Sequence, residues 1–124
     1  MLAYAFTEIP GFSKIGAYIG NGNADGAFIY TGFKPAWLMI KRTNSTSSWG
    51  ISDTKREGYN VDNDFIMADT VAAEVTNDYV DLLSNGFKIR NSGTAVGVNN
   101  SNYVFMAFAE HPFGGDGIAP ATAR

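Results

Sequence analysis

The chain has 124 residues, a formal net charge of −3 and no cysteine. This length fits a single domain, the weakly acidic charge argues against nucleic acid as the main partner, and the lack of cysteine excludes disulfides and thiolate chemistry. Hydrophobic residues make up 45% of the chain and there are 14 glycines, which favours a packed core joined by many turns over disorder.

Short apolar runs separated by turn residues recur about every ten residues, a spacing typical of β-sandwiches and barrels. We predict ten strands, at residues 2–7, 15–19, 27–30, 36–42, 48–52, 64–67, 79–83, 87–90, 95–98 and 103–109. The predicted fold is therefore all-β, a sandwich or jelly-roll-like domain of about 8–10 short antiparallel strands. We place this domain at residues 12–113, with residues 1–11 resembling a junction with a preceding domain and residues 114–124 as a Gly-, Ala- and Pro-rich tail.

The first predicted strand leads into a motif that recurs at the other end of the chain. Residues 5–10 and residues 107–112 share the pattern AFxExP, and each copy closes an apolar run. Two interpretations fit this repeat. The chain begins with the last strand of a related, preceding domain, or the two runs pair or occupy equivalent places within one domain. Both favour a modular, all-β structural protein.

The repeated motif also holds the most obvious candidates for catalysis. Glu8 and Glu110 occupy matching positions, and a pair of carboxylates can cleave a glycosidic bond. We favour the alternative that each carboxylate caps a turn or accepts backbone N–H bonds. His111 is the only histidine, but the first copy of the motif has Ile9 at the matching position. No nucleophile motif accompanies the histidine. We therefore predict a protein that is not an enzyme and needs no cofactor.

A loop at residues 20–26 follows the second predicted strand, and it has the glycines but not the G-K-[ST] ending of a phosphate loop. Its amide and carboxylate side chains suit sugar hydroxyls. Trp49 lies in a polar context and is expected to be exposed, where an aromatic ring can stack on a glycan. The candidate ligand-binding residues are Asn21, Asn23, Asp25, Trp49 and Tyr59.

The run at residues 36–42 is the most continuously apolar in the chain. It predicts a strand buried on both faces, with Trp37 in the core. This strand should pair with residues 49–52 across a polar loop at residues 43–47. A second hairpin is predicted around Asn85 and Gly86, because Asn-Gly favours a two-residue turn.

Asp62, Asn63 and Asp64 form the densest group of oxygen ligands between these hairpins. Calcium binds six to eight such oxygens, so Asp62 and Asp64 are candidate metal ligands, although the spacing differs from an EF-hand. The alternative is a polar loop before a strand. The one helix candidate, at residues 71–77, is too short to persist without packing, and a single turn or irregular loop is favoured.

Four segments together carry a resemblance to a known family: FSKIGAYIGNGNADG at 12–26, YTGFKPAWLMIKRT at 30–43, DLLSNGFKIR at 81–90, and residues 103–124, which end in AFAEHPFGGDGIAPATAR. The chain resembles a C-terminal domain of predicted tail-fibre and other virion proteins of marine bacteriophages, where it often follows a lectin-like sandwich. The resemblance implies a β fold and a virion-associated role. It implies no catalytic residues, because the family has no established activity, and this chain departs from it mainly at residues 59–77.

We therefore expect a non-enzymatic structural module of a bacteriophage virion, in a tail fibre, head fibre or decoration protein, that is assembled in the host cytoplasm. A contribution to host-surface attachment is compatible with this role, and the alternative is a glycan-binding module for receptor recognition. The expected partners are further copies of the chain, with a trimer favoured, other virion proteins and a host glycan. Neither nucleic acid binding nor membrane insertion is expected, since no stretch approaches the ~20 apolar residues of a membrane span.

Overall fold

The computed structural model describes residues 1–56, 64–114, 117 and 120. It contains the following strands: β1 (Ser13–Ile19), β2 (Phe28–Tyr30), β3 (Pro35–Arg42), β4 (Gly50–Asp53), β5 (Ile66–Met67), β6 (Val80–Leu83), β7 (Gly86–Ile89) and β8 (Asn102–Ala109). No helix occurs among the described residues. The predicted all-β class is therefore confirmed.

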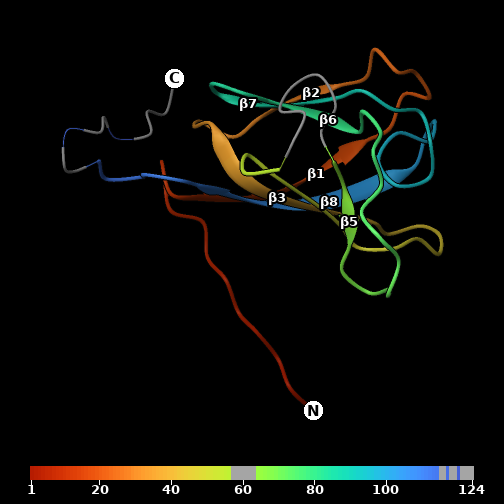
Figure 1. The fold of residues 1–124 in the computed structure, drawn as a ribbon, viewed down its shortest axis with the longest axis horizontal. Helices are drawn as coiled ribbons and strands as arrows, with labels where there is room; N and C mark the ends of the chain where they lie inside the picture. The colour runs from red at the N-terminus through yellow and green to blue at the C-terminus, as the bar shows by residue number, and fades with distance from the viewer. Residues whose placement is uncertain (57–63, 115–116, 118–119, 121–124) are drawn as a thin grey trace.

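The strands form two antiparallel sheets that lie one above the other in Figure 1. One sheet has five strands in the order β1-β8-β3-β4-β5, and the other has three in the order β2-β7-β6. The last long strand, β8, pairs with both β1 and β3 and so joins the two ends of the chain. This layered arrangement is compatible with the predicted sandwich.

The hydrophobic core lies between the two sheets. Successive side chains of a strand point to opposite faces, and on β8 the buried set is Tyr103, Phe105 and Ala107. Leu38 and Ile40 of β3 pair with two of these residues and are also buried. The three-stranded sheet and the segments that connect the strands add the rest of the core: Ile29, Phe33, Phe65, Val80, Leu82, Phe87, Ile89 and Val96.

The two faces of β3 differ in burial, so the prediction that both are buried is wrong. Leu38 and Ile40 face the core, whereas Trp37, Met39 and Lys41 point to the other side and are only half-buried. The apolar neighbours of Trp37 predict a core residue, and this prediction is wrong.

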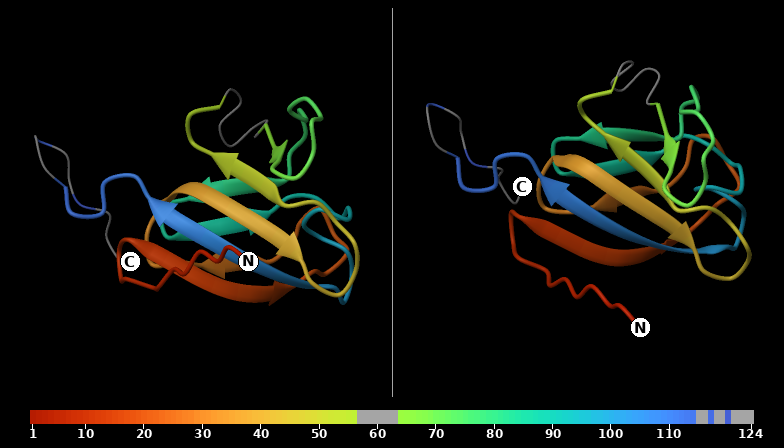
Figure 2. Two further views of the ribbon diagram at one scale, coloured as in Figure 1. Left: turned by 90° about the horizontal axis from the view of Figure 1, so that it is seen from below. Right: turned by 60° about the horizontal axis from the view of Figure 1, so that its bottom comes forward.

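The strand predicted at residues 2–7 is not formed. These residues are exposed and belong to no strand, and Figure 1 shows them extending from the five-stranded sheet on the side away from the three-stranded sheet. The views in Figure 2 agree on this course. We call residues 1–8 the N-terminal arm.

The strand predicted at residues 95–98 is also not formed, because this segment is a turn. The Gly97 N–H donates to the Gly93 carbonyl at 2.9 Å, and two tyrosine hydroxyls add further hydrogen bonds. Tyr18 Oη donates a hydrogen bond to the Val96 carbonyl at 2.8 Å. Tyr103 Oη accepts one from the Val98 N–H at 3.0 Å. These bonds satisfy backbone groups that a sheet partner would otherwise have to satisfy.

Both predicted hairpins are present, as β3–β4 and β6–β7, but the second turn lies one residue earlier than predicted. Leu83 pairs with Gly86, so Ser84 and Asn85 form the turn and Gly86 already belongs to β7. A Cβ atom on Gly86 would lie 2.1 Å from the carbonyl oxygen of Ile29. The glycine is therefore needed for the close approach of β2 and not for the turn.

The remaining helix candidate, at residues 71–77, is an irregular loop, as favoured from its length. One backbone bridge between Val75 and Phe65 connects it to the body of the domain. Among the described residues, no helix is long and apolar enough to cross a membrane.

Candidate functional site: the outer face of the five-stranded sheet

The five-stranded sheet carries an unbroken apolar row on its outer face, the face turned away from the three-stranded sheet. Ile15 pairs with Met106, Met106 with Met39, Met39 with Ile51, and Ile51 with Ile66. Residues paired in this way are side-by-side neighbours on one face of a sheet. The five side chains therefore run across all five strands, and we call them the outer row.

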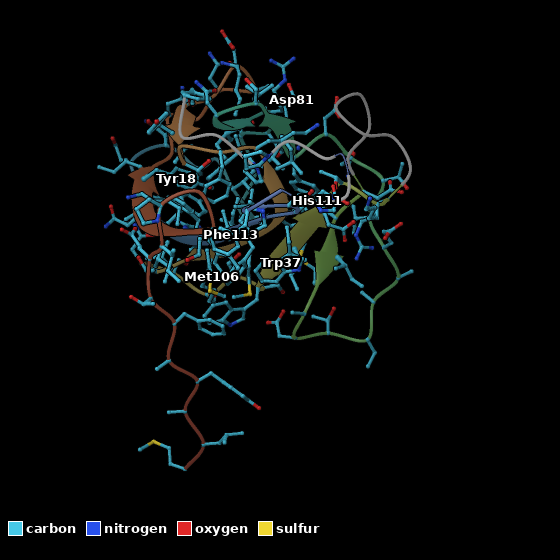
Figure 3. All side chains as sticks on the ribbon, turned by 90° about the vertical axis from the view of Figure 1, so that its left-hand side faces the viewer. Tyr18, Trp37, Asp81, Met106, His111 and Phe113 are labelled. Atoms are coloured by element: carbon cyan, nitrogen blue, oxygen red, sulfur yellow. The ribbon has the colours of Figure 1, made fainter. Side chains whose placement is uncertain are left out.

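Aromatic side chains border the outer row on one side. Trp37 and Phe108 pair across β3 and β8, with ring centroids 5.7 Å apart. Phe6 of the N-terminal arm meets Phe108 edge-on, with centroids 6.1 Å apart. Figure 3 shows Met106 and Trp37 on the side of the molecule from which the arm extends, and Asp81 on the opposite side.

A hollow of about 250 Å³ opens over the outer row. Its lining includes Phe6, Ile15, Met39, Trp49, Val104 and Met106. Trp49 is 41% exposed, which confirms the expectation that it is the more exposed tryptophan. The hollow thus has a mainly apolar lining with an indole at its edge.

Lys41 supplies the charge at the edge of this hollow. Its Nζ donates a hydrogen bond to the Ser47 carbonyl and lies 5.9 Å from the centre of the Trp49 ring, a distance at which a cation is attracted to the ring face. The β3–β4 hairpin therefore fixes the lysine and the indole together. A ligand suited to this place has an apolar body with a polar group at one end.

The predicted ligand-binding loop lies elsewhere. Its polar groups hold the loop itself: Asn21 Oδ1 accepts the Asn23 N–H at 3.0 Å, and Asn23 Oδ1 accepts the Asp25 N–H at 2.9 Å. Asp25 also pairs with Lys88 of β7 at 2.8 Å, and this hydrogen-bonded lysine lowers the pKa of the Asp25 carboxyl. The structure therefore separates the loop, which contacts the three-stranded sheet, from Trp49 on the other sheet.

Only one of the two predicted metal ligands lies among the described residues. Asp62, like the predicted ligand residue Tyr59, lies outside the described residues. Asp64 is half-buried, and its Oδ1 has no hydrogen-bond partner in the part of the chain that the structure describes. Among those same residues, no group of three or more His, Asp or Glu side chains could hold a metal ion. The calcium site stays a prediction.

The two AFxExP motifs lie side by side through Phe6 and Phe108, but their glutamates have separate partners. Glu8 pairs with Lys14 at 3.1 Å and accepts the Ile15 N–H at 3.1 Å. This is the backbone-accepting role favoured for it from the sequence. The Lys14 hydrogen bond, assisted by that of the Ile15 N–H, lowers the pKa of Glu8.

The second glutamate lies beside the single histidine. Glu110 pairs with Lys55 at 2.5 Å, and the hydrogen bond from Lys55 lowers the pKa of Glu110. His111 Nε2 is 3.8 Å from the same carboxylate, and its side chain is 46% exposed. Each glutamate thus pairs with its own lysine at an exposed place. The two glutamates do not form a carboxylate pair.

Comparison with known protein families matches residues 1–112 to the family described as Domain of unknown function (DUF7483). The chain belongs to this family. The DUF7483 match includes the N-terminal arm, all eight strands and the outer row. Comparisons with curated proteins and with solved structures found no match.

Sequence reasoning did not find the outer row, although the DUF7483 sequence contains a signal for it. In β1, Ile15 and Ile19 occupy the positions that point away from the core, and in β8 Val104 and Met106 do the same. A strand that faces water on one side normally alternates apolar and polar residues. Strands without that alternation have two apolar faces. Only the pairing register shows that the apolar side chains on the outer faces of these strands lie next to one another.

Proposed function

We propose that this DUF7483 chain is a non-enzymatic structural module of a bacteriophage virion, in a tail fibre, head fibre or decoration protein. The observation that carries the proposal is the outer row with its aromatic border. Contiguous exposed apolar patches on a small protein mark surfaces that contact other molecules. A domain whose broadest sheet keeps such a face is suited to being packed against neighbours in an assembly.

The sequence supplies the second support. The four segments that resemble phage tail-fibre and virion domains include β1, β3, β6, β7 and β8, so the resemblance extends over the strands that carry most of the outer row. Self-association is part of this proposal, because closed homo-oligomers are the commonest assemblies.

The test is to look for the protein in purified phage particles. The chain's peptides should co-purify with virions through a density gradient, in a constant ratio to the major capsid protein, and an antibody to the domain should label intact particles. Peptides confined to the soluble fraction of infected cells would contradict the proposal. Host proteins of similar size serve as the matched control for carry-over.

A glycan-binding role at the host surface is a second candidate, and the half-exposed Trp49 at the edge of the hollow favours it. Aromatic rings with one exposed face are suited to ligands that are partly apolar and partly polar. Replacing Trp49 with Ala should then abolish binding of the domain to whole host cells, while Phe113→Ala, at another exposed aromatic position, leaves binding unchanged. Equal cell binding by both variants would remove this candidate.

A further inference from the structure

The N-terminal arm exposes apolar side chains at every second position. Leu2 is 78% exposed, Tyr4 79% and Phe6 56%. In an extended chain, alternate side chains lie on one side, so these three can form one apolar edge. Exposed side chains of this size, placed together on a projecting segment, are unfavourable in water and indicate that the arm has a binding surface.

Hydrogen bonds at the base of the arm direct the arm away from its own domain. Ile9 and Ser13 form a backbone bridge, and continuing this pairing would place Thr7 opposite Ile15 at the open edge of β1. Instead, Glu8 Oε1 accepts the Ile15 N–H at 3.1 Å. Ser13 Oγ donates to the Thr7 carbonyl at 2.8 Å. These side chains take the hydrogen bonds that a strand formed by the arm would need, so the arm is directed away from its own β1.

The outer row matches the arm in chemistry, because both present apolar side chains. The hollow beside Trp49 and Lys41 offers an apolar lining with a polar edge, which suits the ring and hydroxyl of Tyr4.

We propose that the outer row binds the N-terminal arm of a second copy of this chain, with Tyr4 in the hollow. A second copy is the occupant because the arm belongs to the same chain, is rooted at the edge of the hollow through Phe6, and nevertheless points away from its own sheet (Figure 3). Exchange of arms then covers the exposed side chains of the arm and the partly exposed outer row at once. It yields a two-fold dimer when reciprocal and a closed ring when cyclic.

The area involved is sufficient for a stable contact. An aromatic side chain buries about 150–250 Å², so Tyr4 and Leu2 together would remove roughly 300 Å² of arm surface and a similar area of the sheet. Two exchanged arms therefore bury roughly 1,200 Å², which is at the lower limit for specific interfaces. The inference gives a structural form to the self-association included in the proposed function, but it does not depend on the virion role.

The first test measures the mass of the full chain in solution by light scattering over a range of concentrations. The chain should self-associate, and Leu2→Ser with Tyr4→Ser should weaken association by roughly 100-fold through lost apolar burial. Ala3→Ser, on the same exposed arm but between the apolar positions, is the matched control. A monomer at all concentrations, or an oligomer that the double substitution does not weaken, would overturn the proposal.

The second test identifies the contact, and it is clean because the chain has no cysteine of its own. An Ala5→Cys chain, which keeps Leu2, Tyr4 and Phe6, mixed with an Ile51→Cys chain should form a mixed disulfide under mild oxidation. Ala5→Cys mixed with Val71→Cys, a fully exposed position in a loop, should form far less. A disulfide that forms only within one chain carrying both Ala5→Cys and Ile51→Cys would show that the arm closes on its own sheet and would refute exchange. Neither result bears on whether the protein is found in particles, so the two proposals fail separately.

Discussion

Tyr103→Phe removes a single oxygen from a fully buried side chain and tests what holds the turn at residues 93–98. The hydroxyl accepts the Val98 N–H at 3.0 Å and donates to the Thr94 carbonyl at 3.2 Å. The ring remains, so its stacking on Tyr18, with centroids 5.0 Å apart and planes 9° apart, is unchanged. The substitution therefore isolates the two hydrogen bonds.

Their contribution follows from the burial of the groups left behind. A neutral hydrogen bond contributes about 0.5–1.5 kcal/mol, and an orphaned buried donor costs about 1–3 kcal/mol. Thr94 is exposed and Val98 is half-buried, so water can replace the hydroxyl at the Thr94 carbonyl but only partly at the Val98 N–H. We expect the free energy of unfolding to fall by about 1.5 kcal/mol.

Urea unfolding measures this change directly. The midpoint should fall with an unchanged slope, because the surface exposed on unfolding stays the same, and the melting temperature should fall by roughly 6 °C. Val71→Ala is the control, since Val71 is fully exposed and should change stability by less than about 0.5 kcal/mol. If Tyr103→Phe were as silent as the control, the Gly97 N–H bond to the Gly93 carbonyl and the Tyr18 hydroxyl would be sufficient to hold the turn, and the reasoning would be refuted.

Three further predictions concern the strands and the carboxylates. Gly86→Ala should destabilise the domain by roughly 3 kcal/mol in urea unfolding, because its Cβ would lie 2.1 Å from the Ile29 carbonyl oxygen. A loss below about 1 kcal/mol would mean that β2 can shift to make room for the Cβ, and would contradict this prediction. Glu8 has a pKa below its ordinary 4.5, so its contact with the Ile15 N–H is present above pH 4.5 and lost as pH falls through the folded pKa. Hydrogen-exchange protection of the Ile15 amide should therefore decline on acidification, and in Glu8→Gln this decline should be absent. Burial raises the pKa of Asp81 above 3.8, so its ionisation reduces stability as pH rises through the folded pKa; Asp81→Asn should remove this loss between pH 3 and pH 7, and an unaltered pH profile would contradict the assignment.

The repeated AFxExP motif shows how far local pattern reasoning extends. The second copy begins in a strand, β8, as predicted, and continues past its end at Ala109. The first copy has nearly the same sequence, but it begins in an exposed arm. The difference arises because β8 has a partner strand on each side, while Glu8 and Ser13 occupy the backbone groups at the arm's root. Strand propensity reflects packing against neighbours more than the residues themselves.

The candidate site was predictable only in part. Trp49 was expected to be exposed, and it lines the hollow on the outer face. Asn21, Asn23 and Asp25 were grouped with it by composition, but the two asparagines bond to their own loop and Asp25 pairs with Lys88. Composition identifies groups able to bind a ligand, but it does not indicate which of them are already occupied by the protein's own backbone.

The sequence by itself determined the all-β class, the positions of most strands and both hairpins, because period-two alternation and turn residues act over a few neighbouring positions. Only the tertiary structure decided which side of β3 is covered, where the arm points, and that Ile15, Met106, Met39, Ile51 and Ile66 form one row. Those outcomes depend on the register between strands that are distant in the chain. A shift of one residue in that register would move every side chain of a strand to the opposite face, and no local pattern specifies it.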